Sequence, residues 1–272
     1  MPLKDNYTSS TANVYVTYDL DAPPEHPGPE WTRFVCISDT HSRKFKVPDG
    51  DVLLHSGDIS SWGYLVQVEA GMKWIESLPH RIKVVVAGNH DLCLDEEWAD
   101  GGYWEKKAGD SMPLTDVQAA RAMVRSEKLR EAGIHYLEHE STTIVTESGR
   151  SWEIYGSPAT PRFAFGAFQY KNKPEAREVY SRIPPSAEIL LTHTPPSGML
   201  DMTKKRKKAG CPILTDRLAS DDLAHLRLHV FGHIHEAHGA EVQAATDNKP
   251  ERVYVNAAVP DSLIPVIVDL HN

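Results

Sequence analysis

Short runs of apolar residues, each followed at once by polar ones, recur along the chain. Residues 33–38, 52–56 and 82–87 are rich in Val, Ile and Leu, which is typical of strands buried on both faces of a sheet. Residues 188–192 and 226–231 share this character. Because polar side chains come directly after each run, the pattern predicts five buried strands whose carboxyl ends present these side chains at the edge of a sheet.

In some of the intervals between these runs, apolar residues recur at the spacing of a helix. Residues 65–78 place apolar side chains three and four positions apart and stop at Pro79, which predicts a helix. A second helix is predicted from residue 115 to about Gly133, opened by a capping box formed by Thr115 and Gln118. Further strands are predicted at residues 142–145, 152–155, 252–256 and 264–270.

This order of elements predicts one α/β domain over residues 31–272, preceded by an extended N-terminal arm over residues 1–30. Residues 21–30 are rich in proline and cannot form a helix or a central strand. The 272 residues suffice to bury a full core, and no change in composition marks an internal boundary. Residues 92–114 and 156–170 predict long loops, and the aromatic side chains of the second either pack together or wall a pocket.

The formal net charge of −9 argues against a nucleic-acid partner, because phosphate backbones bind to basic surfaces. It does not argue against a small phosphorylated substrate, since bound cations would supply positive charge locally. One basic run, Lys204 to Lys208, contrasts with this acidity. A solvated loop is the favoured interpretation of the run, and a nuclear-localisation or phosphate-binding role is the alternative.

The three cysteines Cys36, Cys93 and Cys211 show no C-x-x-C spacing, so neither a disulfide framework nor a zinc finger is indicated. Residues 1–19 lack the apolar segment of a signal peptide, and no stretch approaches 18 continuous apolar residues. A cytoplasmic location without a membrane partner is therefore expected. The oligomeric state does not follow from the sequence.

The polar residues that follow the five runs are of the kinds that bind metals. His233 and His235 lie two positions apart in an extended segment, so their rings point the same way while Ile234 points toward the core. This short motif alone is weak evidence. A given residue type occurs at roughly one position in twenty, so the full ordered set is not accidental. The set comprises Asp39, His41, Asp58, Asn89, His90, Asp91, His193, His233 and His235.

These positions match signature blocks: D-x-H at residues 39–41, G-D at 57–58, G-N-H-D at 88–91, His193, and G-H-x-H at 232–235. In them the sequence resembles the calcineurin-like metallophosphoesterase superfamily over residues 34–235. Residues 37–42, 155–158 and 231–236 are similar to its metallophosphoesterase-domain-containing subgroup. The resemblance implies the calcineurin-like phosphoesterase fold, an α/β four-layer sandwich of two mixed β-sheets flanked by helices.

The resemblance also implies a site with two divalent transition-metal ions. A carboxylate can bridge cations about 3.5–4 Å apart because it has two oxygens. Mixed nitrogen and oxygen ligands suit Mn, Fe, Zn, Co or Ni, and the sequence does not choose among these metals. One ion would be held by Asp39, His41 and His235, and the other by Asn89, His193 and His233, with Asp58 as the bridge.

The remaining motif residues are expected to act around the ions. The resemblance assigns His90 to the phosphoryl transition state or to protonation of the leaving oxygen, with Asp91 orienting and charging it. The alternative is that His90 only packs in its loop. His55 is expected to be a buried residue behind the ligands. Arg43, His238 and Asn256 lie near the motifs and either contact the phosphate or base or are structural.

The predicted function is hydrolysis of a small phosphodiester, for which a cyclic nucleotide is one candidate, by in-line attack of a metal-held hydroxide. Two alternatives stay open: a phosphomonoesterase that acts on a phosphoprotein or nucleotide, and a non-catalytic nucleotide-binding module. Some animal members of the subgroup carry glycine where this chain has His233, which weakens one metal site. Because this chain keeps the histidine, the resemblance implies a complete ligand set.

Overall fold

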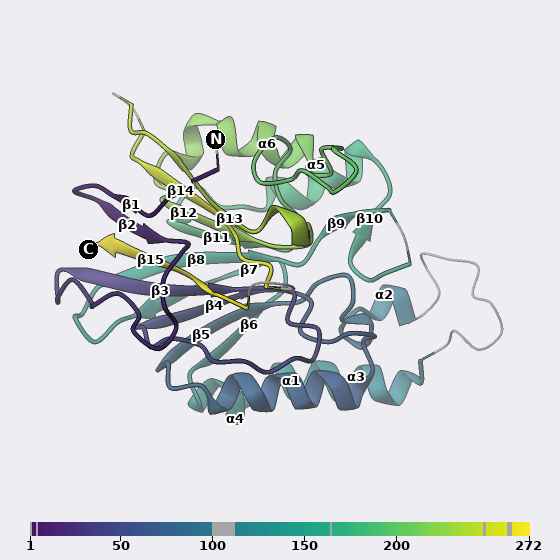
Figure 1. Cartoon of the computed structure of the whole chain (residues 1–272). Helices are drawn as coiled ribbons and strands as arrows, with labels where there is room; N and C mark the ends of the chain where they lie inside the picture. The colour runs from purple at the N-terminus through teal and green to yellow at the C-terminus, as the bar shows by residue number, and fades with distance from the viewer. Residues whose placement is uncertain (1, 4, 100–111, 164, 247–248, 260–262) are drawn as a thin grey trace.

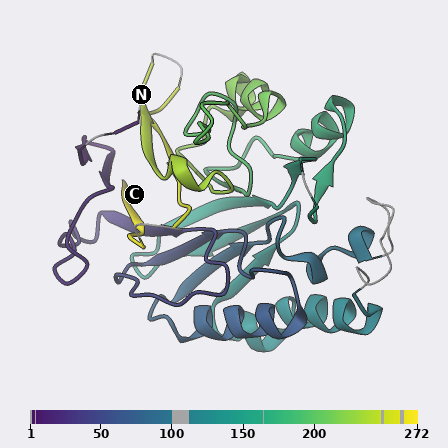
Figure 2. The ribbon, with the colours of Figure 1, turned by 45° about the vertical axis from the view of Figure 1, so that its right-hand side comes forward.

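Two mixed sheets are stacked face to face, and helices cover the outer face of each, as Figure 1 shows. The computed structural model describes residues 2–3, 5–99, 112–163, 165–246, 249–259 and 263–272. Figure 2 shows the same layers from the side, with the two sets of helices on opposite sides of the molecule. The four-layer α/β sandwich expected from the sequence is therefore confirmed.

The first sheet has seven strands. Neighbours from β3 to β6 run parallel, whereas β15 is antiparallel to both β2 and β3. Three helices lie on its outer face: α1 (Leu65–Ser77), α3 (Leu114–Val124) and α4 (Glu127–Glu131). In spatial order the strands are β1 (Tyr7–Thr8), β2 (Ala12–Tyr15), β15 (Val266–His271), β3 (Trp31–Ile37), β4 (Val52–Ser56), β5 (Ile82–Val86) and β6 (Ile134–Leu137).

The second sheet has six strands, and its four central strands are parallel. Its outer face carries α5 (Lys173–Ser181) and α6 (Pro212–Ala219). In spatial order its strands are β13 (Gly239–Gln243), β14 (Arg252–Asn256), β12 (Leu228–Phe231), β11 (Ile189–Thr192), β8 (Ser151–Ser157) and β7 (Glu140–Val145). The smaller elements are β9 (Thr160–Pro161), β10 (Gln169–Tyr170), α2 (Glu96–Ala99), η1 (Leu92–Leu94), η2 (Asp221–Leu223) and η3 (His235–Ala237).

Burial on both faces explains the continuous apolar runs. Successive strand side chains point to opposite faces, so Phe34 of β3 faces the other sheet while Val35 packs toward the helices. Trp152 is fully buried between the sheets, with its ring edge-on to that of Phe34 at a centroid distance of 5.4 Å. Every residue of β4, β5, β11 and β12 is buried. The core thus fixes the strand ends that carry the polar motifs.

Two regions differ from the sequence expectations. The expected arm over residues 1–30 contributes β2 to the first sheet, where Ala12 and Val14 are buried because β15 offers them a pairing edge. The longest stretch of this segment without regular structure is residues 23–28. The single helix predicted from Thr115 is two helices, because Ser126 adopts an extended conformation and caps α4. The predicted capping box is wrong, since the N-cap of α3 is Pro113.

The predicted loops are only partly loops. Residues 92–99 contain η1 and α2, and residues 100–111 lie outside the described residues. The segment 156–170 holds the end of β8 and the short parallel pair β9–β10, while residue 164 is also outside the described residues. Among the helices that the structure describes, none combines the length and apolar composition needed to cross a bilayer.

Candidate metal centre

The polar motifs meet at one end of the two stacked sheets. Parallel strands bring their carboxyl ends to the same edge, and β3, β4 and β5 of the first sheet do so opposite β11 and β12 of the second. The convergence predicted from the sequence is therefore present, although metal binding by these residues stays a prediction. The residues that follow these strands are Asp39, His41, Asp58, Asn89, His193, His233 and His235.

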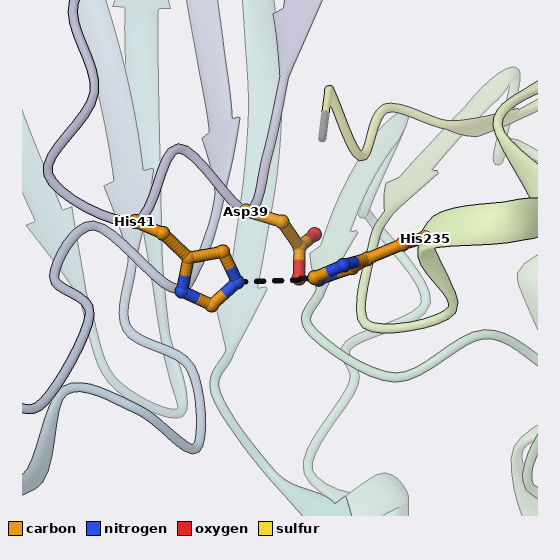
Figure 3. Close-up of side chains that lie close together, drawn as sticks. All are labelled: Asp39, His41 and His235. Atoms are coloured by element: carbon orange, nitrogen blue, oxygen red, sulfur yellow. Dashed lines mark hydrogen bonds and ion pairs between the residues drawn. The ribbon is translucent and has the colours of Figure 1, made fainter. Parts of the chain in front are cut away.

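A first cluster consists of Asp39, His41 and His235, and Figure 3 shows their side chains pointing toward one another from two separate chain segments. The His235 Nε2 atom lies 3.1 Å from Asp39 Oδ1 and 3.2 Å from His41 Nε2. Ligand atoms of all three residues lie within 4.8 Å of one another. Two imidazole nitrogens and a buried carboxylate oxygen thus face a common point, as the ligands of one cation would.

A second cluster forms around His193, which is completely buried. Its Nδ1 donates a hydrogen bond of 2.8 Å to the Ser56 carbonyl, so in the neutral ring Nε2 carries a lone pair. That Nε2 atom lies 3.0 Å from Asn89 Oδ1 and 3.4 Å from Asp58 Oδ1. The His233 ring adjoins the His193 ring edge-on, at a centroid distance of 5.1 Å. Lone pairs that face one another in this way require a shared proton or a cation.

Asp58 lies between the two clusters. Its Oδ2 is 3.7 Å from His41 Nε2 and its Oδ1 is 3.4 Å from His193 Nε2, so each oxygen faces a different imidazole. Burial disfavours the ionised form of Asp58. The nearby histidines, with His193 first among them, together have the larger, opposite effect and hold the pKa of the Asp58 carboxyl below its usual range. Burial likewise opposes the charged form of His193, yet Asp58 raises the pKa of this imidazole to about 9. The protonation states of the two clusters therefore depend on each other through Asp58.

This donor set fits divalent metal ions. Buried carboxylates need positive charge nearby, and within the described residues neither Asp39 nor Asp58 pairs with a lysine or arginine. Among the described residues, histidines supply the positive charge near the two carboxylates. Burial disfavours the charged form of these rings and lowers the pKa of His233 to about 4. A cation bound among these nitrogen and oxygen atoms would satisfy both carboxylates and leave the rings neutral.

The backbone at the centre is locally strained. Asp39, His41, Asp58 and His233 have positive φ angles of 55°, 46°, 55° and 67°. Such conformations cost on the order of 1–3 kcal/mol each and persist where the surrounding structure enforces them. Here the turns follow buried strands, which hold these backbone conformations in place. The conformations direct the side chains toward the centre.

Three glycines allow the ligands to approach the backbone closely. A Cβ atom at Gly232 would overlap Asp39 Oδ2, and one at Gly88 would overlap Asp58 Oδ1. At Gly57 it would overlap His193 Nδ1. No separate role was expected of these glycines, although their place immediately before a candidate ligand in three motifs is a signal of close approach.

His90 lies beside the first cluster. Its ring is edge-on to that of His41 at a centroid distance of 4.7 Å, and its Nδ1 donates a 2.7 Å hydrogen bond to the Ser61 carbonyl. The backbone N–H of His90 also donates to Asp58 Oδ1 at 2.8 Å. The Ser61 carbonyl, which the sequence analysis missed, therefore orients the ring and fixes its tautomer.

Asp91 does not contact the His90 ring, which corrects the sequence expectation. The turn after Gly88 directs the Asp91 carboxylate inward, where it is fully buried. Burial and the Asp58 charge raise the pKa of Asp91 to about 6. Asp91 therefore holds the loops around the site together. It accepts hydrogen bonds from the N–H groups of Ile59, Ser60 and Gly88 and from the Ser60 hydroxyl.

Asn256 makes structural contacts, which is one of the two alternatives that the sequence left open for it. It is fully buried, and its amide nitrogen donates to the carbonyls of Leu200 and Ile234, both at 3.0 Å. Its amide oxygen accepts from the Ala258 N–H at 3.2 Å. Asn256 thus fixes the turn between the two histidines of the G-H-x-H motif.

Arg43 and His238, for which the sequence left the same two alternatives, lie in different surroundings. The Arg43 guanidinium donates to backbone carbonyls below the first cluster, those of Asp39, Thr40 and Val259, at 3.3–3.5 Å. His238 follows η3 and is half-buried, and burial lowers the pKa of its ring. His55 is fully buried, with its Nε2 3.1 Å from Thr40 Oγ1, behind the ligands as expected.

The basic run lies next to the G-H-x-H turn. Its five side chains are exposed, and a bridge between Met202 and Lys208 closes the run into a hairpin. The backbone N–H of Lys204 donates to the carboxylate of Glu236, the residue after His235. A solvated loop, the favoured interpretation, agrees with this exposure.

Known proteins share sequence similarity with this chain over the residues that carry the polar motifs. A family model described as calcineurin-like phosphoesterase matches residues 32–237. Metallophosphoesterase domain-containing protein 1 of Homo sapiens is 32% identical over 277 residues, covering 94% of this chain and 79% of that protein. The Mus musculus protein of the same name matches equally. A solved Staphylococcus aureus structure, provisionally named a 5′-nucleotidase, has a TM-score of 0.45 and 12% identity over 83% of this chain and 48% of its own.

Proposed function

Because the chain belongs to the calcineurin-like phosphoesterase family, we propose that it is a metal-dependent hydrolase of small phosphodiesters. The observation that carries the proposal is the position of Asp58 between His41 and His193. A carboxylate whose two oxygens face two different imidazoles is suited to bridge two cations. A small phosphorylated molecule, with a nucleotide as one candidate, is the substrate class.

Two divalent ions, Mn, Fe or Zn, are the proposed cofactors. Asp39, His41 and His235 would hold one ion, and Asn89, His193 and His233 the other. Bound there, the ions would neutralise phosphate charge and provide an ionised water at neutral pH.

His90 is the proposed general acid. Its Nδ1 is committed to the Ser61 carbonyl, so the proton given to the leaving oxygen would come from Nε2. With Nδ1 bonded, Nε2 could face either the leaving oxygen or a cation, since His41, Asp58 and His90 also have ligand atoms within 4.8 Å of one another. The backbone N–H of His90, bonded to Asp58, keeps the ring beside the two clusters.

Charge favours a diester over a monoester. A phosphodiester carries one negative charge on the scissile phosphate, whereas a monoester carries up to two and is commonly clamped by arginine. Among the residues that the structure describes, the arginine nearest the motifs, Arg43, donates to backbone carbonyls. A singly charged diester would therefore need less positive charge beyond the proposed ions than a monoester would.

Hydrolysis of bis(p-nitrophenyl) phosphate and of p-nitrophenyl phosphate, each with added Mn, tests the proposal. We expect a higher kcat/KM for the diester. Preference for the monoester would identify a phosphomonoesterase instead. A nucleotide that stays bound and intact while metal analysis finds both ions would identify a binding module. Asp58→Asn is the control for activity from a contaminating phosphatase.

A further inference from the structure

An exposed tryptophan adjoins the proposed general acid. The side chain of Trp62 is 66% exposed, and its ring centroid lies 6.4 Å from that of His90, with the planes 57° apart. Tyr64, two residues on, is also 58% exposed. Burial of a large aromatic ring is strongly favourable in free energy. An exposed indole beside the proposed general acid is therefore a candidate binding surface for a ligand.

The backbone that carries Trp62 is fixed on both sides. The Ser61 hydroxyl donates to the His41 carbonyl at 2.6 Å, and the Ser61 N–H donates to the Ser42 hydroxyl at 3.2 Å. The Trp62 N–H donates to Gln67 Oε1 at 2.9 Å. These bonds leave only the indole free to meet a ligand. They tie its position to the residues that hold the proposed ions.

The following residue is equally constrained. Gly63 has a φ of +70°, and a Cβ atom there would overlap the Leu92 backbone. Its N–H donates to the Ser60 hydroxyl at 3.1 Å, and its carbonyl accepts from the Cys93 N–H at 3.1 Å. A binding surface preorganised in this way loses little conformational entropy when a ligand binds.

We propose that Trp62 forms a stacking subsite for a flat aromatic group on the leaving side of the substrate. This inference rests on the proposed hydrolysis and on His90 acting at the leaving oxygen. A ring attached to that oxygen, or to a sugar that carries it, would reach the indole beside His90. The subsite therefore selects aryl and nucleoside esters over alkyl esters. Base stacking on an aromatic side chain is typically worth about 10-fold to 100-fold in affinity.

The test compares two methyl phosphodiesters, one with a phenyl and one with a hexafluoroisopropyl leaving group, whose alcohols are similarly acidic. We expect Trp62→Leu to lower kcat/KM for the phenyl ester by about 10-fold to 100-fold and to leave the alkyl ester within about twofold. Trp62→Phe should retain most of the phenyl preference. Tyr64→Ala is the matched control, an exposed aromatic truncated two residues away, and should preserve the preference.

Equal losses for both esters would overturn the subsite and make Trp62 a positioning residue for His90. An unchanged phenyl preference in Trp62→Leu would overturn it as well. Failure of the proposed function is distinct, because the unmodified protein would then hydrolyse neither ester. Titration with adenosine monophosphate gives a readout without turnover. Its Kd should rise about 10-fold to 100-fold in Trp62→Leu, while metal analysis of both proteins finds the same content.

Discussion

The two sheets supply different atoms to the candidate centre. The first contributes three oxygen ligands and one imidazole, whereas the second contributes imidazoles only. Neither sheet alone presents the mixed donor set that suits transition metals. The centre therefore exists only where the sheets are stacked. The first set is Asp39, His41, Asp58 and Asn89, and the second is His193, His233 and His235.

The two sets overlap in exposure, since His193 of the second is also completely buried, but their individual members differ. The side chains of Asp39 and Asp58 are 0% and 2% exposed, whereas that of His235 is 37% exposed. Buried carboxylates depend wholly on their neighbours for charge compensation, while an imidazole near solvent can be neutral without one. Substitutions on the oxygen side should thus have larger effects than those on the nitrogen side.

Asp58→Ala should have the largest effect. It removes the carboxylate whose two oxygens face imidazoles of different sheets, so metal content and kcat/KM should fall together, the latter by about 10³-fold or more. Metal analysis and diester hydrolysis measure the two losses. An Ala variant that still binds two ions per chain would exclude the bridge. Asp58→Asn separates the loss of charge from the loss of volume.

His90→Ala should have the next largest effect, although His90 is proposed as the general acid and not as a metal ligand. Loss of a general acid typically lowers kcat by about 10²- to 10⁴-fold, and the bound metal should be retained. The decrease should be smaller for a p-nitrophenyl ester than for an alkyl ester, because a good leaving group needs little protonation. Equal decreases would assign His90 to charge stabilisation. Loss of metal would make it a ligand.

His233→Gly tests the nitrogen side. It removes one imidazole of the second sheet without touching either buried carboxylate, so activity should fall by about 10-fold to 100-fold while the thermal unfolding midpoint of the metal-free protein changes little. A kcat/KM ratio against the unmodified enzyme measures the loss. Unchanged turnover would mean that the ion expected at His193 is not needed.

Gly232→Ala tests how closely the backbone before His233 must approach Asp39 for metal to bind. The added methyl group would overlap Asp39, so metal affinity should fall by about 10-fold, measured by titration of the metal-free protein. Gly149→Ala is the matched control. Its φ of +84° imposes strain, but its Cβ atom meets nothing within 4 Å, so metal affinity should not change. Equal effects in both variants would point to a general loss of stability.

The smallest expected effect is the pH dependence of the metal-free protein. Asp58 raises the folded-state pKa of His193 from 6.5 to about 9, so the stabilisation is complete below pH 6.5 and lost as the pH rises through 9. The free energy of unfolding should fall by about 1–3 kcal/mol over that window. Denaturant unfolding after chelation measures it, and His193→Gln should weaken the dependence. A rise in stability over the same window would contradict the pairing.

The sequence predicted the strand ends well because buried parallel strands are continuous apolar runs and their motif residues follow directly. It could not predict the inward turn of Asp91 or the bonds of Asn256, since both depend on partners from distant segments. The same limit applies to β2. Its pairing with β15 joins residues more than 250 positions apart, and no local pattern specifies such a partner. The metal-binding roles stay predictions.

The position of β15 has a consequence for biosynthesis. Residues 266–271 are inserted between β2 and β3, so the first sheet cannot close until the ribosome has added them. Until then one edge of β3 lacks a partner, which exposes the nascent chain to aggregation and to chaperones. All seven candidate ligands are synthesised earlier than β15. The sheet that presents four of them is completed only with β15, so metal loading in the cell should follow the synthesis of that strand.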